Sequence, residues 1–198
     1  GVTNKIFVEL GVGDGLENNT VYLLLKNWSG YWIEGNKHYG RKIKKGFSRL
    51  INSKKMIVKN NFIKKETINH TLKEMGVPDK FDLLSIDIDG NDYWILESMR
   101  PFKPRLIIVE YNASLGKEII YLPDYDPNYV WDKSNFMGAS LAKINDLLEK
   151  RGYKLVACNL TGANAFFVRG DLIENKFFKP GDIDFHFEAP TYDELLNR

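Results

Sequence analysis

The sequence predicts an α/β fold in which a mostly parallel β-sheet ends in an antiparallel hairpin. Short apolar runs alternate with segments whose apolar residues recur at helical spacing. Three glycines, Gly11, Gly13 and Gly15, follow the first apolar run, and the last two runs are joined by a turn with no helix between them. Such strand–helix alternation requires right-handed crossovers and produces a parallel sheet that helices cover on both faces.

Five strands that we expect to be parallel precede the two strands of the hairpin. The first five occupy residues 6–10, 31–34, 56–60, 81–87 and 106–110, and the hairpin strands occupy 153–158 and 165–168. Helices are expected at 21–26, capped by Asn18, Asn19 or Thr20, and at 64–75, 93–99 and 140–151. The 198 residues suffice for one domain with a substantial core.

The composition excludes several classes of protein. The chain is 43% hydrophobic and 27% charged, as globular proteins are, and its net charge of +2 gives no overall reason to bind nucleic acid or a membrane. Cys158 is the single cysteine, so an internal disulfide and a cysteine-only metal site are excluded. No apolar run approaches the roughly 20 residues that span a bilayer. We expect a cytoplasmic protein.

The domain boundaries are predicted from the start of the first strand. This strand begins almost at Gly1, which suggests that residues 1–198 are a single domain excised from a longer protein. Residues 113–137 are expected to form a substrate loop, and 171–198 a C-terminal extension that packs back on the body.

The glycine turn predicts a nucleotide-type cofactor site. Glycine accepts positive φ and lets the backbone approach a ligand closely, and a strand–turn–helix unit exposes free N–H groups there. Glu34 ends the second strand about twenty residues later, where a carboxylate accepts the hydroxyl protons of a ribose. The alternative for Glu34 is an exposed residue before a turn. Asn60, Asn61 and Phe62 end the third strand, where a base ring could be contacted.

Two segments outside the strands carry further functional hypotheses. Residues 38–55 are strongly basic, which is usually a solvated helix face, although a nucleic-acid surface is the alternative. The loop 113–137 is rich in Tyr, Asp and Trp, which suits stacking on a sugar ring and bonding its hydroxyls. An irregular lid without ligand contacts is the alternative for that loop.

Four carboxylates are expected to crowd the ends of the fourth and fifth strands: Asp87, Asp89, Asp92 and Glu110. Two carboxylates about 4 Å apart repel by roughly 4 kcal/mol at an effective dielectric constant near 20. The cluster must therefore bind a cation, share protons or partly face water.

The motifs together resemble those of class I S-adenosylmethionine-dependent methyltransferases, over nearly the whole chain. Glu9-Leu-Gly-Val-Gly-Asp-Gly15 is similar to their first motif, Glu34 to the acid that ends their second strand, and Asp87 to the acid that ends their fourth. Within that superfamily, the segment 82–90 resembles the FkbM-type branch, which O-methylates sugars and polyketides. The resemblance implies a Rossmann-like seven-stranded methyltransferase sheet.

The resemblance also implies a set of cofactor contacts. It assigns the methionine part of S-adenosylmethionine to the glycine loop, the ribose to Glu34 and the adenine to residues 60–62. The full set of expected cofactor-binding residues is Glu9, Gly11, Gly13, Gly15, Thr20, Glu34, Asn60, Asn61, Phe62 and Asp87.

A second resemblance bears on a metal ion. The segment 89–92 is similar to that of metal-dependent sugar O-methyltransferases of the macrocin type, with Asp92 where that family has its catalytic His. Glu110 matches their Glu, Tyr111 stands where they have Asp, and Asn112 is the nearest other oxygen ligand. Mg²⁺ or Mn²⁺ held by Asp89, Glu110 and Asn112 is therefore implied.

Methyl transfer needs the acceptor oxygen, the methyl group and the sulfur in line, and a base or metal for the hydroxyl proton. Asp92 and Asp89 are the candidate bases, and the alternative for Asp92 is an acid that interacts with the helix dipole.

The predicted function is an O-methyltransferase acting on a sugar or glycan, within a larger glycan-processing polypeptide. The alternatives are an RNA methyltransferase that uses the basic face of residues 41–55, and a non-catalytic module that binds the cofactor or a glycan.

Overall fold

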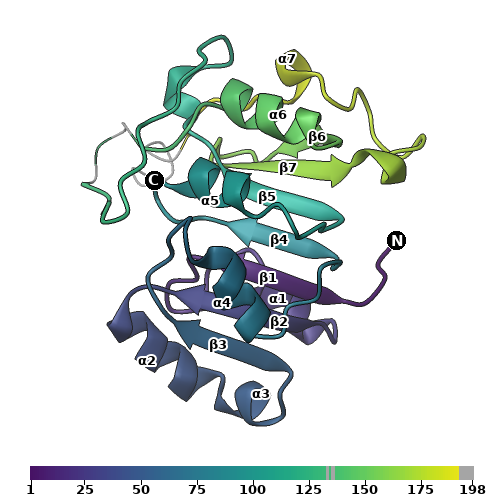
Figure 1. Cartoon of the computed structure of the whole chain (residues 1–198). Helices are drawn as coiled ribbons and strands as arrows, with labels where there is room; N and C mark the ends of the chain where they lie inside the picture. The colour runs from purple at the N-terminus through teal and green to yellow at the C-terminus, as the bar shows by residue number, and fades with distance from the viewer. Residues whose placement is uncertain (133, 135–136, 192–198) are drawn as a thin grey trace.

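The computed structural model contains one seven-stranded sheet with the strand order β3-β2-β1-β4-β5-β7-β6 (Figure 1). The structure describes residues 1–132, 134 and 137–191. Positions 133, 135 and 136 of the predicted substrate loop, and 192–198 of the predicted extension, lie outside the described residues.

The strands pair as the sequence predicts. Five are parallel: β1 (Ile6–Leu10), β2 (Ser29–Glu34), β3 (Met56–Asn60), β4 (Leu83–Ile86) and β5 (Leu106–Glu110). The other two, β6 (Tyr153–Cys158) and β7 (Asn164–Arg169), are antiparallel to each other, and β7 is antiparallel to β5. The predicted fold class is therefore confirmed, and β7 lies between β5 and β6.

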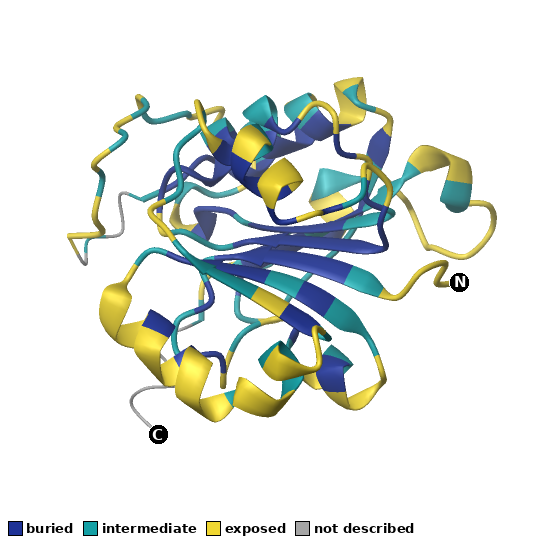
Figure 2. Cartoon of the chain, turned by 60° about the horizontal axis from the view of Figure 1, so that its bottom comes forward, coloured by how far each residue is buried: buried dark blue, intermediate teal, exposed yellow. Residues whose placement is uncertain are grey.

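Helices cover both faces of the sheet because each has an apolar stripe. On one face, α1 (Val21–Leu25), α2 (Lys37–Gly46) and α3 (Ser48–Asn52) cover a core that includes Phe7 and Trp32. On the other, α4 (Ile68–Glu74), α5 (Asp92–Ser98) and α6 (Leu141–Lys150) cover the larger core around Val8 and Leu84. The central strands are buried between these layers (Figure 2). Short helices at η1 (Ala113–Leu115), η2 (Gly170–Leu172) and α7 (Ile183–His186) complete the fold.

The direction of winding reverses between β1 and β4. The chain passes from β1 outward to β3, returns to β4 on the other side of β1, and continues to β5. In open α/β sheets the crevice at the carboxyl ends of the strands on either side of such a reversal is the usual ligand site. The loops after β1, β2, β4 and β5 all end at this crevice.

The predicted substrate loop is anchored to the start of α5. The indole N–H of Trp94 donates to the carbonyl of Pro123 at 2.9 Å, and the amide of Asn91 donates to the carbonyl of Asp126 at 2.7 Å. The ammonium of Lys65 lies over the rings of both Trp94 and Tyr125. These contacts hold the first half of the loop beside the crevice.

The described part of the predicted C-terminal extension packs back on the body, as expected. The hydroxyl of Tyr111 donates to the carbonyl of Glu188 at 2.8 Å, and the backbone N–H of Gly181 donates to the carbonyl of Leu155 at 2.7 Å. Within the described residues, no helix has the length and apolar character needed to cross a membrane.

Partial burial of Cys158 is expected to lower the reactivity of its thiol. Desolvation raises the pKa of this thiol from 9.0 to about 11, so the thiolate at pH 8 is roughly 100-fold less populated than in the unfolded chain. We expect alkylation by iodoacetamide at pH 8 to be slower by about that factor in the native protein than in urea, as measured by mass spectrometry. Equal rates in the two states would contradict this prediction.

Candidate functional site

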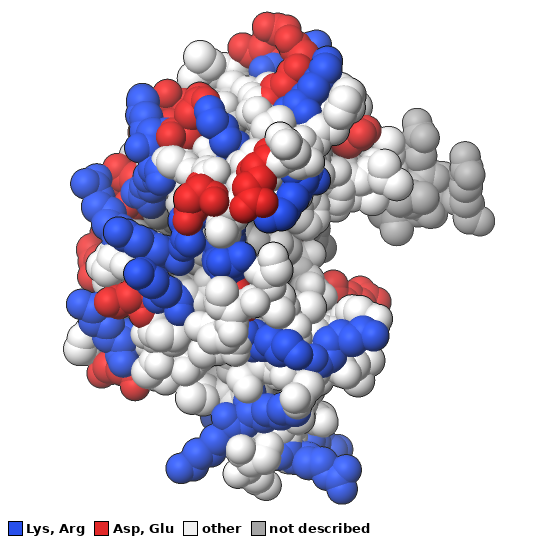
Figure 3. Space-filling view, turned by 90° about the vertical axis from the view of Figure 1, so that its right-hand side faces the viewer, with Lys and Arg blue, Asp and Glu red and all other residues white. Residues whose placement is uncertain are grey.

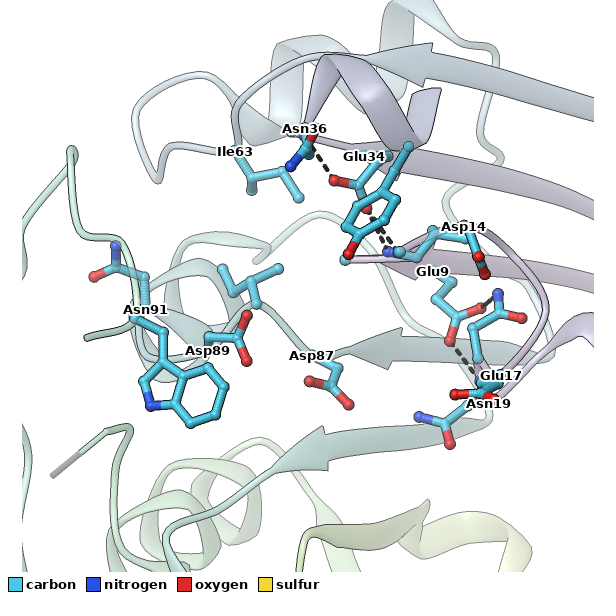
Figure 4. Close-up of a pocket in the computed structure, with 18 of the residues that line it drawn as sticks. Glu9, Asp14, Glu17, Asn19, Glu34, Asn36, Ile63, Asp87, Asp89 and Asn91 are labelled. Atoms are coloured by element: carbon cyan, nitrogen blue, oxygen red, sulfur yellow. Dashed lines mark hydrogen bonds between the residues drawn. The ribbon is translucent and has the colours of Figure 1, made fainter. Parts of the chain in front are cut away.

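A pocket of about 920 Å³ lies at the carboxyl ends of the central strands. It is lined by the glycine turn after β1, the turn after β2, the segment after β4, the loop at 129–131 and the β6–β7 turn. Figure 4 shows the carboxylates of Glu9, Asp87 and Asp89 along one wall, and Glu34 with Asn36 on another. The pocket therefore brings together segments that are far apart in the sequence.

Glu34 binds the glycine turn directly. Its carboxylate accepts the backbone N–H of Val12 at 3.0 Å and that of Gly13 at 2.8 Å, and also that of Asn36 at 2.6 Å. The side chain is buried yet lines the pocket. A carboxylate offers about four acceptor positions, so Glu34 retains roughly one for a ligand.

Glycine is needed at each of the three positions of the turn for a different physical reason. A Cβ on Gly11 would lie 1.7 Å from the carbonyl oxygen of Asp87, because the ends of β1 and β4 approach closely there. Gly13 has a φ of +59° with open space around it and lines the pocket. Gly15 lies outside the pocket lining, where a Cβ would meet the rings of Phe47 and Trp32. Gly15 is therefore needed for close packing of the core that α1, α2 and α3 cover.

Glu9 is a buried carboxylate with a full set of donors. It accepts the N–H of Asn19 at 2.9 Å, the amide of Asn18 at 2.5 Å and the hydroxyl of Thr20 at 2.5 Å. Burial raises the pKa of Glu9, and these hydrogen bonds oppose that rise. Thr20 in turn accepts the indole N–H of Trp32 at 2.9 Å and lies outside the pocket lining. Thr20 is the N-cap residue of α1, as one of the three predicted candidates, but its hydroxyl donates to Glu9 and makes no side-chain capping bond to the helix.

The residues expected around a base ring separate into two groups. Phe62 is 44% exposed and lines the pocket together with Tyr39, which the sequence did not single out. Asn60 and Asn61 lie outside the pocket lining. The Asn60 amide donates to the carbonyl of Glu34 at 2.6 Å, and the N–H of Asn61 donates to the same carbonyl at 3.0 Å. These two hydrogen bonds hold in place the backbone that precedes Phe62.

Asp92 organises the turn that carries Asp89. One carboxylate oxygen of Asp92 accepts the N–H of Ile88 and the other accepts the N–H of Gly90, both at 2.9 Å. Asp92 is 1% exposed and lies outside the pocket lining. Asp89 adopts a left-handed φ of +59° in this turn and is exposed in the pocket. Of the two candidate bases, Asp89 is therefore the one that faces a ligand.

Three carboxylates converge at this edge of the sheet. Asp87, Asp89 and Glu110 each offer an oxygen within 4.8 Å of the others. Burial, with repulsion from Asp92 and Asp89, raises the pKa of Asp87 to about 7, and burial followed by repulsion from Asp87 raises the pKa of Glu110 well above its usual value. In the described part of the chain, no Lys or Arg forms an ion pair with these three carboxylates, so the cluster is short of positive charge.

Asn164 joins this cluster from the last strand. It pairs with Glu110 in the β5–β7 register, and its side chain hydrogen-bonds Asp87. Asn164 is 8% exposed, and its side-chain oxygen Oδ1 and Oε2 of Glu110 are buried without a hydrogen-bond partner within the described residues. No local sequence pattern points to Asn164, because its place in the cluster depends on β7 lying beside β5.

Asn112 takes a local role. Its side-chain oxygen accepts the N–H of Ser114 at 3.1 Å and caps η1, and it lies outside the pocket lining. Of the predicted metal ligands Asp89, Glu110 and Asn112, the structure brings the first two together, and their third neighbour is Asp87, which was expected to contact the cofactor.

The comparisons with known proteins identify the family. The family described as "Methyltransferase FkbM domain" matches residues 2–155. This chain belongs to the FkbM methyltransferase family. The predicted resemblance is thereby confirmed, and no curated protein matches the chain.

Solved structures share the fold at low sequence identity. A putative caffeoyl-CoA O-methyltransferase from Staphylococcus aureus is 18% identical with a TM-score of 0.51, over 83% of this chain and 76% of that one. An O-methyltransferase from Bacillus cereus in complex with SAH, the demethylated form of S-adenosylmethionine, is 15% identical with a TM-score of 0.51, over 82% and 72%. The METTL16 methyltransferase domain is 14% identical with a TM-score of 0.53, over 85% and 60%.

The geometry of the glycine turn predicts different costs for two alanine substitutions. Gly13→Ala pays only for a left-handed alanine, about 1–2 kcal/mol, which lowers the Tm by roughly 4 °C. Gly11→Ala adds a clash with the Asp87 carbonyl and is expected to lower the Tm at least twice as far, or to prevent folding. Thermal unfolding followed by circular dichroism measures both, and equal losses would show that the close approach of β1 and β4 is unimportant.

Proposed function

We propose that this FkbM-family chain is an S-adenosylmethionine-dependent O-methyltransferase that acts on a hydroxyl group of a sugar or glycan. The observation that carries the proposal is the single pocket that joins Glu34 and the glycine turn to Asp89 and the loop at 129–131. One half of the pocket suits a nucleoside cofactor, and the other half suits a polar acceptor with a carboxylate nearby.

The cofactor half offers suitable partners for each part of S-adenosylmethionine. Glu34 retains an acceptor position for a ribose hydroxyl, and the exposed rings of Phe62 and Tyr39 offer apolar surfaces to adenine. The carboxylate cluster around Asp87 lacks a cation, and the sulfonium brings one positive charge. The SAH of the Bacillus cereus enzyme supports this choice of cofactor.

The acceptor half supports hydroxyl chemistry. Tyr129 and Trp131 line this half of the pocket together with the polar residues Asn91, Asn159 and Thr161. The amide of Asn91 already donates to Asp126 and that of Asn159 to the Thr161 hydroxyl, so the Thr161 O–H is the group that we assign to a sugar hydroxyl. A sugar hydroxyl is a weak acid and needs a base within hydrogen-bond reach. We assign that role to Asp89, whose pKa burial raises, with Asp92 holding the turn that orients it.

A divalent cation fits the same carboxylates. Asp87, Asp89 and Glu110 provide hard oxygen ligands of the kind that Mg²⁺ and Mn²⁺ prefer, and the unpartnered oxygens of Glu110 and Asn164 lie at the same edge. Such an ion would lower the pKa of an acceptor hydroxyl. We include Mg²⁺ or Mn²⁺ in the proposal, with Asn164 in place of the expected Asn112.

The cofactor and the base are tested by separating binding from turnover. The wild-type chain should bind SAH in calorimetry, and Asp89→Ala should retain this binding within about threefold while methyl transfer to sugar acceptors falls by at least about 100-fold. Asp79→Ala, which removes an exposed acid that precedes β4 and lies outside the pocket lining, is the matched control and should keep full turnover. Absence of SAH binding would refute the proposed cofactor, and an active Asp89→Ala would refute the assigned base.

The metal is tested by chelation and by substitution of Glu110. We expect EDTA to abolish turnover and Mn²⁺ or Mg²⁺ to restore it, and Glu110→Gln to weaken Mn²⁺ binding by about tenfold or more, because a charged ligand is lost. Calorimetry with Mn²⁺ measures the second effect, and Asn112→Ala should leave it unchanged. Full activity in EDTA would remove the metal from the proposal.

A further inference from the structure

The charges of this chain are strongly segregated. Residues 35–65 contain eleven Lys and Arg residues and none of the 26 acidic residues. The remaining 17 of the 28 basic residues share the rest of the chain with all of the acidic ones. A solvated helix face normally mixes both signs, and like charges four residues apart destabilise a helix, so folding alone does not account for this segment.

The segment forms one exposed surface. Six of its cations are exposed on α2, on α3 or just after α3, and we call them the basic face: Lys37, Arg41, Lys44, Lys45, Arg49 and Lys54. Within the described residues, none of the six forms an ion pair. Figure 3 shows the Lys and Arg side chains at the lower end of the molecule, with no Asp or Glu among them.

The basic face begins at the mouth of the pocket. Asn36 and Tyr39, at the start of α2, line the pocket. The ammonium of Lys42 lies over the Tyr39 ring and pairs with Asp14 of the glycine turn at 3.6 Å. A ligand that leaves the pocket on this side therefore passes directly onto α2, whose ten residues extend about 15 Å.

The pocket itself has the opposite charge. Asp14, Glu17 and Asp89 line it together with the buried Glu9 and the partly buried Asp87. The ligand that fits both surfaces is neutral where it reacts and anionic where it leaves the pocket.

From this arrangement we propose that the acceptor is an anionic glycan, whose reacting sugar enters the pocket while its acidic groups lie on the basic face. This inference rests on the proposed function. Nucleic acid fits less well, because every nucleotide would bring a phosphate to the acidic pocket. Its bases would also find few exposed rings on this side, chiefly Tyr39 and Phe62.

The test compares two triple variants of the full chain. Lys44→Gln/Lys45→Gln/Arg49→Gln removes half of the basic face, and Lys73→Gln/Lys80→Gln/Lys103→Gln removes three exposed lysines elsewhere. The probes are fluorescent dextran sulfate oligomers, neutral dextran of the same length, and oligouridylate with the same number of charges. Fluorescence anisotropy at about 50 mM and about 200 mM NaCl measures each affinity.

We expect dextran sulfate to bind and neutral dextran not to bind, with an affinity that falls steeply at the higher salt concentration. The first variant should bind dextran sulfate about tenfold more weakly, and the second less than twofold. SAH binding should be unchanged in both variants, which keeps a failure of the basic face distinguishable from a failure of the proposed methyltransferase activity.

Three results would overturn the inference. The first is equal loss of affinity in the two variants, which would show that the basic face has no special role. The second is tighter binding of oligouridylate than of dextran sulfate with the same loss in the first variant, which would assign the face to nucleic acid. The third is wild-type chain that binds no dextran sulfate at the lower salt concentration.

Discussion

The carboxylate of Glu34 is the contact on which the geometry of the pocket depends. Its hydrogen bonds to Val12, Gly13 and Asn36 tie the turn after β1 to the turn after β2. A carboxylate that accepts several backbone N–H groups is held rigidly, because each bond to a charged acceptor contributes more than a neutral one. The glycine turn is therefore already shaped for a ligand, and little ordering remains to oppose binding.

The other half of the pocket is built at an energetic cost. Asp87, Asp92 and Glu110 are withdrawn from water close to one another, and their raised pKa values express that strain. The backbone N–H groups of Ile88 and Gly90 relieve part of it at Asp92. The remaining deficit of positive charge is concentrated where a cationic ligand would be stabilised, which is common at sites that perform chemistry.

The sequence predicted the fold well because its signals are local. Apolar runs, glycines and helical periodicity located all seven strands, and α6 (Leu141–Lys150) lies within the helix predicted at 140–151. The errors concern tertiary contacts. Helix α4 begins at Ile68, four residues later than predicted, and the Thr20 side chain at the N-cap of α1 bonds Glu9 and not the helix backbone. Asn164 was missed because no local pattern shows that β7 inserts between β5 and β6.

That insertion has a consequence for how the protein is made. The edge of β5 has no partner until β7 has been synthesised, and β6, which precedes β7 in the chain, can join the sheet only through it. During translation the nascent chain therefore carries an open strand edge and an incomplete carboxylate cluster, since Asn164 arrives last. When β7 pairs with β5, Asn164 completes the carboxylate cluster and the open edge of β5 is covered against strand-to-strand aggregation, so both changes occur in the same late step.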